Sequence, residues 1–356
     1  MNIQKLNLFS LNNNNKNNNV NITKFSGSAN ATYPNLRPLA QDTVSFSGGK
    51  VPTIVKNKLF TQWDPENPTT VKTVKKICDS FEKPLKDFTW NLKKAMEKLI
   101  STESNPDNII LPGTRGVKSR VKAPKGVIRK ANKRKIYTVD EINKMGDVGG
   151  ARIILRTGTQ KDTALVFKQL KELVKQGYKV LEVENYRTLS KDSYVSQSTL
   201  ENFQKFCQNK GQFFPIENKP LKNSYTAVHV SFEVPGGKVI ELQIMGRDVE
   251  HFKDVEDLFY KYRCNEDFAD EYKPIQEKFK EIMPKLDDFQ KETLDRYIKD
   301  SYEHARHSEP VSAKTKFNPD KEFLPFPYSL PQELNPTNLY RWMQKLKAEK
   351  APAKSK

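Results

Sequence analysis

Cysteine is scarce in this sequence, and the three that occur stand far apart, at Cys78, Cys207 and Cys264. An odd number of widely separated cysteines does not build a disulfide framework, and none has the close cysteine neighbour that a zinc knuckle requires. The sequence therefore argues against a disulfide-stapled secreted scaffold. It fits a reducing compartment such as the cytoplasm.

Long apolar runs are also missing. No segment approaches the roughly 18 consecutive apolar residues of a membrane span, and the N-terminus lacks the apolar core of a signal peptide. We therefore expect a soluble, cytoplasmic chain with no membrane partner.

Hydrophobic residues make up only 36% of the 356 residues, which is low for a wholly folded chain. A chain of this length holds either two modest domains or one domain with long appendages. We expect a disordered Asn- and Ser-rich segment at 1–55, because such a composition buries too little surface to offset its ordering entropy. A folded domain at 56–305 follows, and then a Pro-rich tail with a terminal helix at 306–356.

Positive charge is in excess, with a formal net charge of +18. Ten lysines or arginines and no acidic residue lie between Leu111 and Lys135. A generic solvated or RNA-attracting patch is one interpretation of such a run. Because valine and isoleucine are interleaved with the cations, the segment can also pack on a core and hold its charges in fixed positions, which suits a triphosphate.

Apolar residues recur at helical spacing from about Asn67 to Leu99. This pattern predicts a long helix that begins at Thr69 or Thr70, with a candidate break at Pro84. Further helices are predicted at 139–145, 161–176, 199–207, 248–262, 272–305 and 337–349, and strands at 151–157 and 178–185. With the hairpin described next, this order predicts an α+β fold: a mixed sheet of about five strands flanked by helices, with long helices at both ends.

The clearest strand pattern is a β-hairpin over 224–246. Taking Pro235 to Gly237 as a three-residue loop sets Ser231 opposite Glu241 and His229 opposite Gln243. One face of the hairpin is then apolar, and the other gathers tyrosine, histidine, glutamate and glutamine. This polar face is either a functional site or the wet side of an ordinary half-buried hairpin.

Three motifs with charged or polar residues occur in order along the chain. They are Arg120-x-Lys122 with Lys130, Asp147-x-x-Gly150-x-Arg152, and Tyr225-x-x-x-His229 followed by Glu241-Leu-Gln243-Ile. In this order they resemble the synthetase domain of the RelA/SpoT family of alarmone pyrophosphokinases, over roughly residues 115–263. The resemblance implies a nucleotidyltransferase-like sheet and a small, synthetase-only or toxin-like member.

The sequence departs from the family pattern mainly on the acceptor side. Ser224 and Ala227 replace a glycine and a serine around Tyr225, Met245 replaces an arginine after Gln243, and Gly126 replaces a serine. Because the positions to which the resemblance assigns metal binding and base stacking are kept, these departures bear on the identity of the substrate.

The resemblance assigns a Mg²⁺ ion to Asp147 and Glu241, and Glu241 also accepts the proton of the acceptor hydroxyl. Two carboxylates from different elements suffice for Mg²⁺, which retains water and phosphate ligands. The alternative role for Asp147 is to cap a turn. The residues assigned to the phosphates of ATP are Arg120, Lys122, Lys130 and Arg152.

The acceptor is assigned to Tyr225, whose ring would stack on a base, and to His229 and Gln243, which would orient it. The alternatives are a core tyrosine and a structural histidine. With only four histidines in the chain, the separate His-Asp metal domain of the family's hydrolases is not expected.

The resemblance thus implies a Mg²⁺-dependent enzyme that transfers pyrophosphate from ATP to the 3′-hydroxyl of GDP or GTP. A toxin-like relative that modifies the 3′ end of tRNA is the close alternative, and a catalytically weak nucleotide- or RNA-binding module is the third. A homo-oligomer is a further expectation.

Overall fold

The structure is a computed structural model that describes residues 63–186, 193–307 and 312–350. The chain divides into two compact units, residues 1–52 and 53–356, and every described residue belongs to the second. Most of the segment at 1–55 that we predict to be disordered belongs to the first unit, and all of it lies outside the described residues. The three cysteines form no disulfide within the described residues. None of the helices described is both long enough and apolar enough to cross a membrane.

The long N-terminal helix α2 spans Pro68–Met96. Asn67 caps it, because its side chain accepts hydrogen bonds from the backbone N–H groups of Thr69 and Thr70. The sequence places the start at one of these threonines, and the structure moves the cap to Asn67. The reason is that asparagine, too, is a strong N-cap, and Pro68 after it fits the first helical position.

Pro84 lies inside α2 without ending it, so the candidate break is absent. Phe81 and Phe88, on either side of the proline, are fully buried. Tertiary packing of this apolar face therefore holds the helix together across the missing backbone donor. A 3-10 turn, η1 (Glu97–Leu99), follows the helix.

Six strands form one mixed sheet in the order β1-β2-β6-β5-β3-β4. The pairs β2–β6 and β3–β4 are parallel, and the other neighbouring pairs are antiparallel. The strands are β1 Val117–Val121, β2 Gly149–Leu155, β3 Lys179–Asn185, β4 Ile216–Asn218, β5 Val228–Val234 and β6 Lys238–Gly246. The predicted α+β class with a mixed sheet and flanking helices is confirmed, with six strands where the sequence indicates about five.

The hairpin has the predicted register. Ser231 pairs with Glu241 and His229 with Gln243 across the three-residue loop. The first strand, however, begins at Val228 and not at Ser224. Ser224 has a positive φ of 61°, a backbone conformation that a strand does not contain, so Tyr225 precedes the strand.

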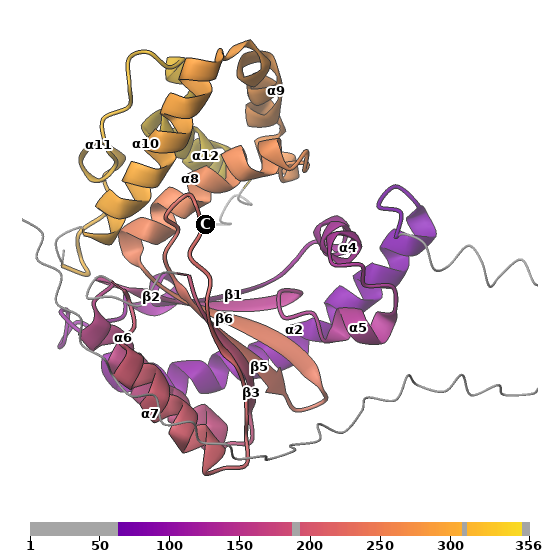
Figure 1. Cartoon of the computed structure of the whole chain (residues 1–356), viewed down its shortest axis with the longest axis vertical. Coiled ribbons are helices and arrows are strands. Elements are labelled where there is room, and N and C mark those ends of the chain that lie inside the picture. The colour runs from indigo at the N-terminus through magenta and orange to yellow at the C-terminus, as the bar shows by residue number, and fades with distance from the viewer. Residues whose placement is uncertain (1–62, 187–192, 308–311, 351–356) are drawn as a thin grey trace, which may run out of the picture. The chain divides into compact units, whose positions relative to one another are not determined.

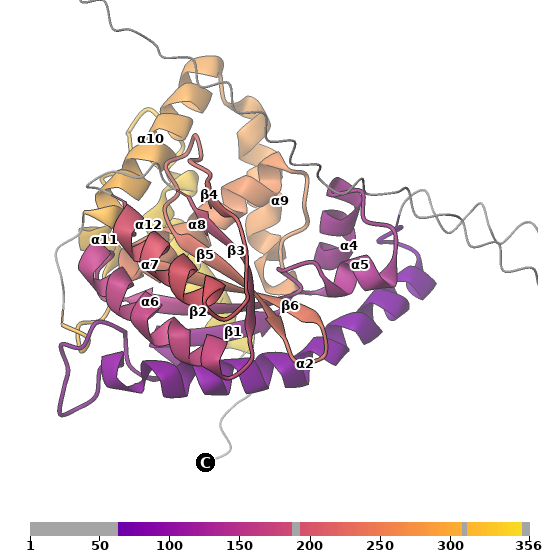
Figure 2. The same ribbon diagram turned by 60° about the horizontal axis from the view of Figure 1, so that its bottom comes forward.

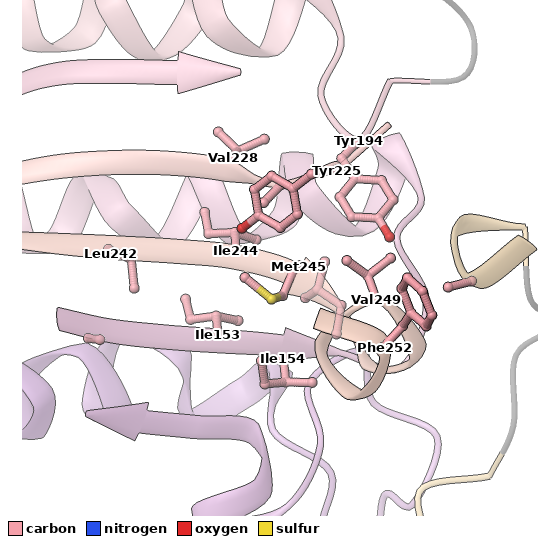
Figure 3. Packing of buried hydrophobic residues seen from close by; sticks show 14 of the residues in the cluster. Ile153, Ile154, Tyr194, Tyr225, Val228, Leu242, Ile244, Met245, Val249 and Phe252 are labelled. Carbon is pink, nitrogen blue, oxygen red and sulfur yellow. The ribbon is translucent and has the colours of Figure 1, made fainter. Parts of the chain in front are cut away.

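Helices α2, α6 (Gln160–Lys175) and α7 (Gln197–Gln208) cover the apolar face of the sheet (Figures 1 and 2). Phe88 of α2 packs on Phe232 of β5, with ring centroids 5.4 Å apart. Figure 3 shows the core side chains of neighbouring strands side by side, among them Ile153, Leu242 and Ile244. Burial of this face fixes which side chains the strands present on the other side.

A second, smaller core lies where α2 meets α4 (Pro124–Lys133) and α5 (Val139–Asn143). Val127 and Ile128 of α4 are fully buried in it. The prediction that the basic segment packs on a core through its interleaved apolar residues is therefore confirmed. This packing anchors the basic segment, which also contains the short helix α3 (Gly113–Gly116), next to the sheet.

On the side of the sheet opposite α6 and α7 lies a C-terminal helical layer (Figure 1). Its helices and turns are α8 Arg247–Arg263, η2 Asp270–Tyr272, α9 Lys273–Ile282, η3 Met283–Lys285 and α10 Asp288–Arg306. The sequence predicts one long helix over 272–305. That prediction is wrong, because the chain forms the turn η3 around Pro284 before α10 begins at its own cap, Asp287.

The C-terminal tail packs on α8. Its elements are α11 Pro319–Glu322, η4 Gln332–Leu334 and α12 Pro336–Lys350, and α12 matches the terminal helix predicted from the sequence. His251 of α8 stacks on Phe317 with ring centroids 3.8 Å apart. The hydroxyl of Tyr340, on α12, lies 3.2 Å from Nδ1 of His251. The tail therefore shares the main core with the helices it covers.

Candidate active site

The face of the sheet that α2, α6 and α7 leave uncovered carries two adjacent rows of polar residues. Residues directly opposite one another on paired strands project to the same side, so each row runs across the sheet. From β1 to β3, the first row is Arg120, Gly150, Glu241, Ser231 and Glu182. From β1 to β4, the second row is Lys118, Arg152, Gln243, His229, Glu184 and Glu217.

The charge changes along both rows. The β1–β2 end is basic and the β3–β4 end is acidic, with Glu241 and Gln243 between them. At the acidic end, Lys219 forms ion pairs with Glu182, Glu184 and Glu217. The predicted polar face is therefore present, and it is polarised from one side of the sheet to the other.

Glu241 lies at the centre of this face, with 15% of its side chain exposed. Its Oε1 accepts a hydrogen bond of 2.6 Å from Nε2 of Gln243, whose Oε1 in turn accepts one of 2.9 Å from Nε of Arg152. Burial raises the pKa of Glu241. The charge of His229 in its protonated form, the hydrogen bond from Gln243 and the charge of Lys130 outweigh that effect, so the pKa lies below its usual value and the carboxylate is ionised.

Asp147, in the turn before β2, is held by two lysines from the basic segment. Its Oδ2 accepts from Nζ of Lys122 at 2.7 Å and also from Nζ of Lys130. Burial raises the pKa of Asp147, but the two ammonium groups outweigh it and lower the pKa. Its Oδ1 is buried and finds no hydrogen-bond partner among residues 63–186, 193–307 and 312–350.

The turn that carries Asp147 lies over the start of the polar face. A Cβ added at Gly146 would come within 3.4 Å of Ser231 Oγ and 4.0 Å of Glu241 Cβ. Lys130 is common to both carboxylates, because its charge lowers the pKa of Asp147 and of Glu241. Direct convergence of Asp147 and Glu241 on one ion stays a prediction, and each has its own partners in the structure.

The two predicted arginines have different surroundings. Nη1 of Arg152 lies 3.6 Å from Glu250 and 3.7 Å from Asp254, both on α8. Arg120 is exposed on the edge strand β1 and takes part in none of the ion pairs found within the described residues. Arg120 is thus open to a ligand, whereas Arg152 is held beneath α8.

The predicted acceptor residues form a chain of contacts. The hydroxyl of Tyr225 lies 3.1 Å from Nε2 of His229. The ring of Tyr225, 6% exposed, is in edge contact with Tyr186 and Tyr302 and lies beside Tyr194 (Figure 3). Stacking on an acceptor base stays a prediction, and it requires this ring to become accessible.

Sequence reasoning missed the acidic residues around the site. Glu250 and Asp254 come from α8, at an i, i+4 spacing that places them on one helix face. Glu182 and Glu184 come from β3, where their alternation with buried valine is the pattern that could have assigned them to the polar face. Both pairs become part of the site only once α8 and β3 are placed against the hairpin.

Comparison with known proteins identifies a family model that matches part of the chain. A family model described as a region found in RelA / SpoT proteins matches residues 119–267, which include every predicted site residue. No curated protein matches the chain.

Several solved structures of low similarity also match. The small alarmone synthetase 1 from Bacillus subtilis, bound to its product pppGpp, is 15% identical, with 64% of this chain and 90% of that chain covered and a TM-score of 0.35. A GTP pyrophosphokinase family protein from Streptococcus pneumoniae is 17% identical, with coverage of 66% and 98% and a TM-score of 0.35. The small alarmone synthetase 2 from Bacillus subtilis is 17% identical, with coverage of 67% and 91% and a TM-score of 0.33.

Proposed function

We propose, on the premise that residues 119–267 form a RelA/SpoT domain, that the chain is an ATP-dependent pyrophosphokinase. It would transfer the β,γ-pyrophosphoryl group of ATP to a ribose 3′-hydroxyl, with GDP or GTP as the acceptor. The observation that supports this best is the pair of polar rows. They set cations for a polyphosphate at one end of the sheet and an ionised carboxylate, Glu241, at the centre.

The donor would lie over the basic end of the rows. Phosphoryl-type transfer asks the protein mainly for positioning and for neutralisation of charge. Arg120 is free to contact phosphate, and Lys122 and Lys130 come from a segment anchored in the smaller core. Both lysines would turn from Asp147 toward the donor when it binds, while Arg152 stays fixed under α8 and orients Gln243.

The family implies Mg²⁺, and two features of this site fit it. Oδ1 of Asp147 is a buried oxygen without a partner in the described part of the chain, and Glu241 is a second ionised carboxylate, whose pKa the same Lys130 lowers. These two residues would hold the ion. When bound, Mg²⁺ would neutralise the phosphates of ATP and the charge that builds up during transfer.

Glu241 would act on the acceptor. Because its pKa is low, it is a weak base, and its main task would be to accept a hydrogen bond from the attacking hydroxyl and fix its direction. In a loose transition state the proton leaves late, so orientation counts for more than basicity. Gln243 and His229, beside Glu241 in the structure, would set the position of the ribose.

The 3′ end of tRNA is a second candidate acceptor. The acidic end of the rows favours it, because carboxylates repel the 5′-phosphates of the acceptor nucleotide and a terminal nucleotide in RNA has fewer of them than GDP or GTP. Glu182, Glu184 and Glu217 surround a single cation, Lys219. GDP and GTP bring two or three 5′-phosphates, whereas a terminal nucleotide in RNA brings one. The net charge of +18 also favours a polyanion.

A panel of acceptors tests the proposal. The purified chain receives Mg²⁺ and γ-labelled ATP together with GDP, GTP or deacylated tRNA. Label in the guanosine nucleotides supports the leading proposal, and label in tRNA alone supports the second candidate. Absence of label in all three would overturn both.

A further inference from the structure

We infer that the chain has a binding site for a first-row divalent transition metal formed by Glu184, His229 and Glu241. Each offers one donor atom, and these atoms lie within 4.8 Å of one another. This is the one such cluster of three among the described residues, and Asp147 is not part of it. Binding of the metal does not depend on the proposed function, but its role in the reaction rests on that function.

The histidine points to a ligand independently of the two carboxylates. His229 is 7% exposed, and its Nδ1 has no hydrogen-bond partner in the part of the chain that the structure describes. This nitrogen faces Oε1 of Glu241 at 3.5 Å and Oε2 of Glu184 at 3.9 Å. An ion with bonds of about 2.1 Å separates its ligand atoms by roughly 3 to 3.5 Å, so small side-chain shifts bring all three onto it.

Each of the three ligands is oriented by a neighbour. The hydroxyl of Tyr186 donates to Oε2 of Glu184 at 2.9 Å, and Gln243 donates to Glu241. The hydroxyl of Tyr225 contacts Nε2 of His229. In the tautomer with the proton on Nε2, this N–H donates a hydrogen bond to the hydroxyl oxygen, and the lone pair of Nδ1 points at the carboxylates. Hydrogen bonds of this kind fix the tautomer and direction of ligands in metal sites.

The ligand types select among cations. An imidazole with two carboxylates suits Mn²⁺, Fe²⁺ or Zn²⁺, whereas Mg²⁺ prefers oxygen ligands and retains its water. The site is therefore distinct in chemistry from the Mg²⁺ site of Asp147 and Glu241, and the two share Glu241. A cation here would offset the carboxylates at the acidic end of the rows and allow an anionic acceptor to approach.

Binding of Mn²⁺ alone, without nucleotide, tests the inference. The full chain is stripped with a chelator, and free Mn²⁺ is titrated by its electron paramagnetic resonance signal. The wild type is expected to bind one ion at this site. Glu184→Gln is expected to weaken binding at least about tenfold.

Glu182→Gln is the matched control. Glu182 lies two residues away on the same strand and the same face, and it also pairs with Lys219, but it is outside the cluster. This variant should bind Mn²⁺ as the wild type does. Equal weakening in both variants would mean that Mn²⁺ is attracted only by the overall negative charge of the β3–β4 end of the rows. That result would overturn the proposed site.

A spectroscopic measurement tests whether His229 is a ligand of the bound ion. Electron spin echo spectra of bound Mn²⁺ should show coupling to an imidazole nitrogen, and His229→Gln should abolish it while circular dichroism stays unchanged. Bound Mn²⁺ without nitrogen coupling in the wild type would contradict the inference.

The inference and the proposed function can fail separately. Transfer activity without Mn²⁺ binding would overturn this inference alone, and Mn²⁺ binding without transfer activity would overturn the proposed function alone.

Discussion

Lys130 and Asp147 form an ion pair in the structure, although the sequence assigns one to the phosphates of ATP and the other to a metal ion. Lys122 joins the same oxygen of Asp147. The two lysines proposed to bind ATP and the carboxylate proposed to bind Mg²⁺ therefore neutralise each other's charge within the protein. Binding of Mg²⁺ and ATP would exchange this internal pairing for lysine–phosphate and carboxylate–metal contacts.

Lys130→Gln is expected to raise the KM for ATP. Loss of one charge-assisted hydrogen bond costs about 1.5 to 3 kcal/mol, which corresponds to a KM roughly tenfold to a hundredfold higher. Steady-state kinetics with varied ATP measures the change. Lys133→Gln is the control, because Lys133 lies one turn further along α4 and points at Tyr260; an equal effect in the control would show that only the general charge of α4 matters.

The pH dependence of ATP binding should also reflect Lys130. Burial lowers the pKa of its ammonium group, although Asp147 partly opposes that effect. The charge is present at pH values below this lowered pKa and is lost as the pH rises through it, so the KM for ATP should rise at a pH below the ordinary lysine range. Lys130→Arg stays charged throughout and should remove the rise. A KM profile from pH 7 to 10 that is the same in both proteins would contradict this assignment.

Tyr225→Phe is expected to destabilise the protein, because it leaves Nε2 of His229 buried without its partner. A buried polar group left unsatisfied costs about 1 to 3 kcal/mol, which urea unfolding can measure. Turnover should also fall while the KM for ATP stays the same, since His229 lies away from the basic end. Phenylalanine keeps the ring, so this variant leaves the predicted stacking role intact. Unchanged stability would contradict the structural role of the contact between Tyr225 and His229.

His251 should make the protein sensitive to mild acid. Burial lowers its pKa to about 4, whereas an unfolded histidine titrates near 6.5. Its folded pKa is depressed, so the stability it contributes is present above about pH 6.5 and is lost as the pH falls toward about 4, with a loss of about 2 kcal/mol near pH 4.5. Urea unfolding at pH 7 and 4.5 measures the loss, and His251→Phe, which keeps a ring against Phe317, should show a smaller one. An equal loss in both proteins would assign the acid sensitivity to other groups.

Local patterns predict much of the fold and the centre of the site. The alternation in the hairpin and its Pro-Gly-Gly loop set Glu241 opposite Ser231 and Gln243 opposite His229, because loop length and side-chain parity determine the register of a hairpin. The interleaved apolar residues of the basic segment likewise predict that it packs on a core.

What the sequence does not reveal depends on contacts between distant segments. Tyr225 is buried partly because Tyr302, on α10, packs against its ring. Glu250 belongs to the site because α8 lies over Lys118 and Arg152, and on a surface helix the same residue has no assignable role. Strand β4 has only three residues, too few for an alternating pattern to be recognised.

The nucleotide product of ATP tests the central claim most directly. Transfer of pyrophosphate to a ribose hydroxyl releases AMP in a one-to-one ratio to the modified acceptor, and chromatography of a reaction with adenine-labelled ATP measures both. Glu241→Gln removes a proposed ligand of Mg²⁺ and the carboxylate that orients the attacking hydroxyl, so it should lower this activity at least about 10²-fold. Glu233→Gln, a half-buried change on the same hairpin that removes only an ion pair with the exposed Lys179, should leave it intact. Release of ADP, release of AMP without a modified acceptor, or full activity in Glu241→Gln would contradict the account.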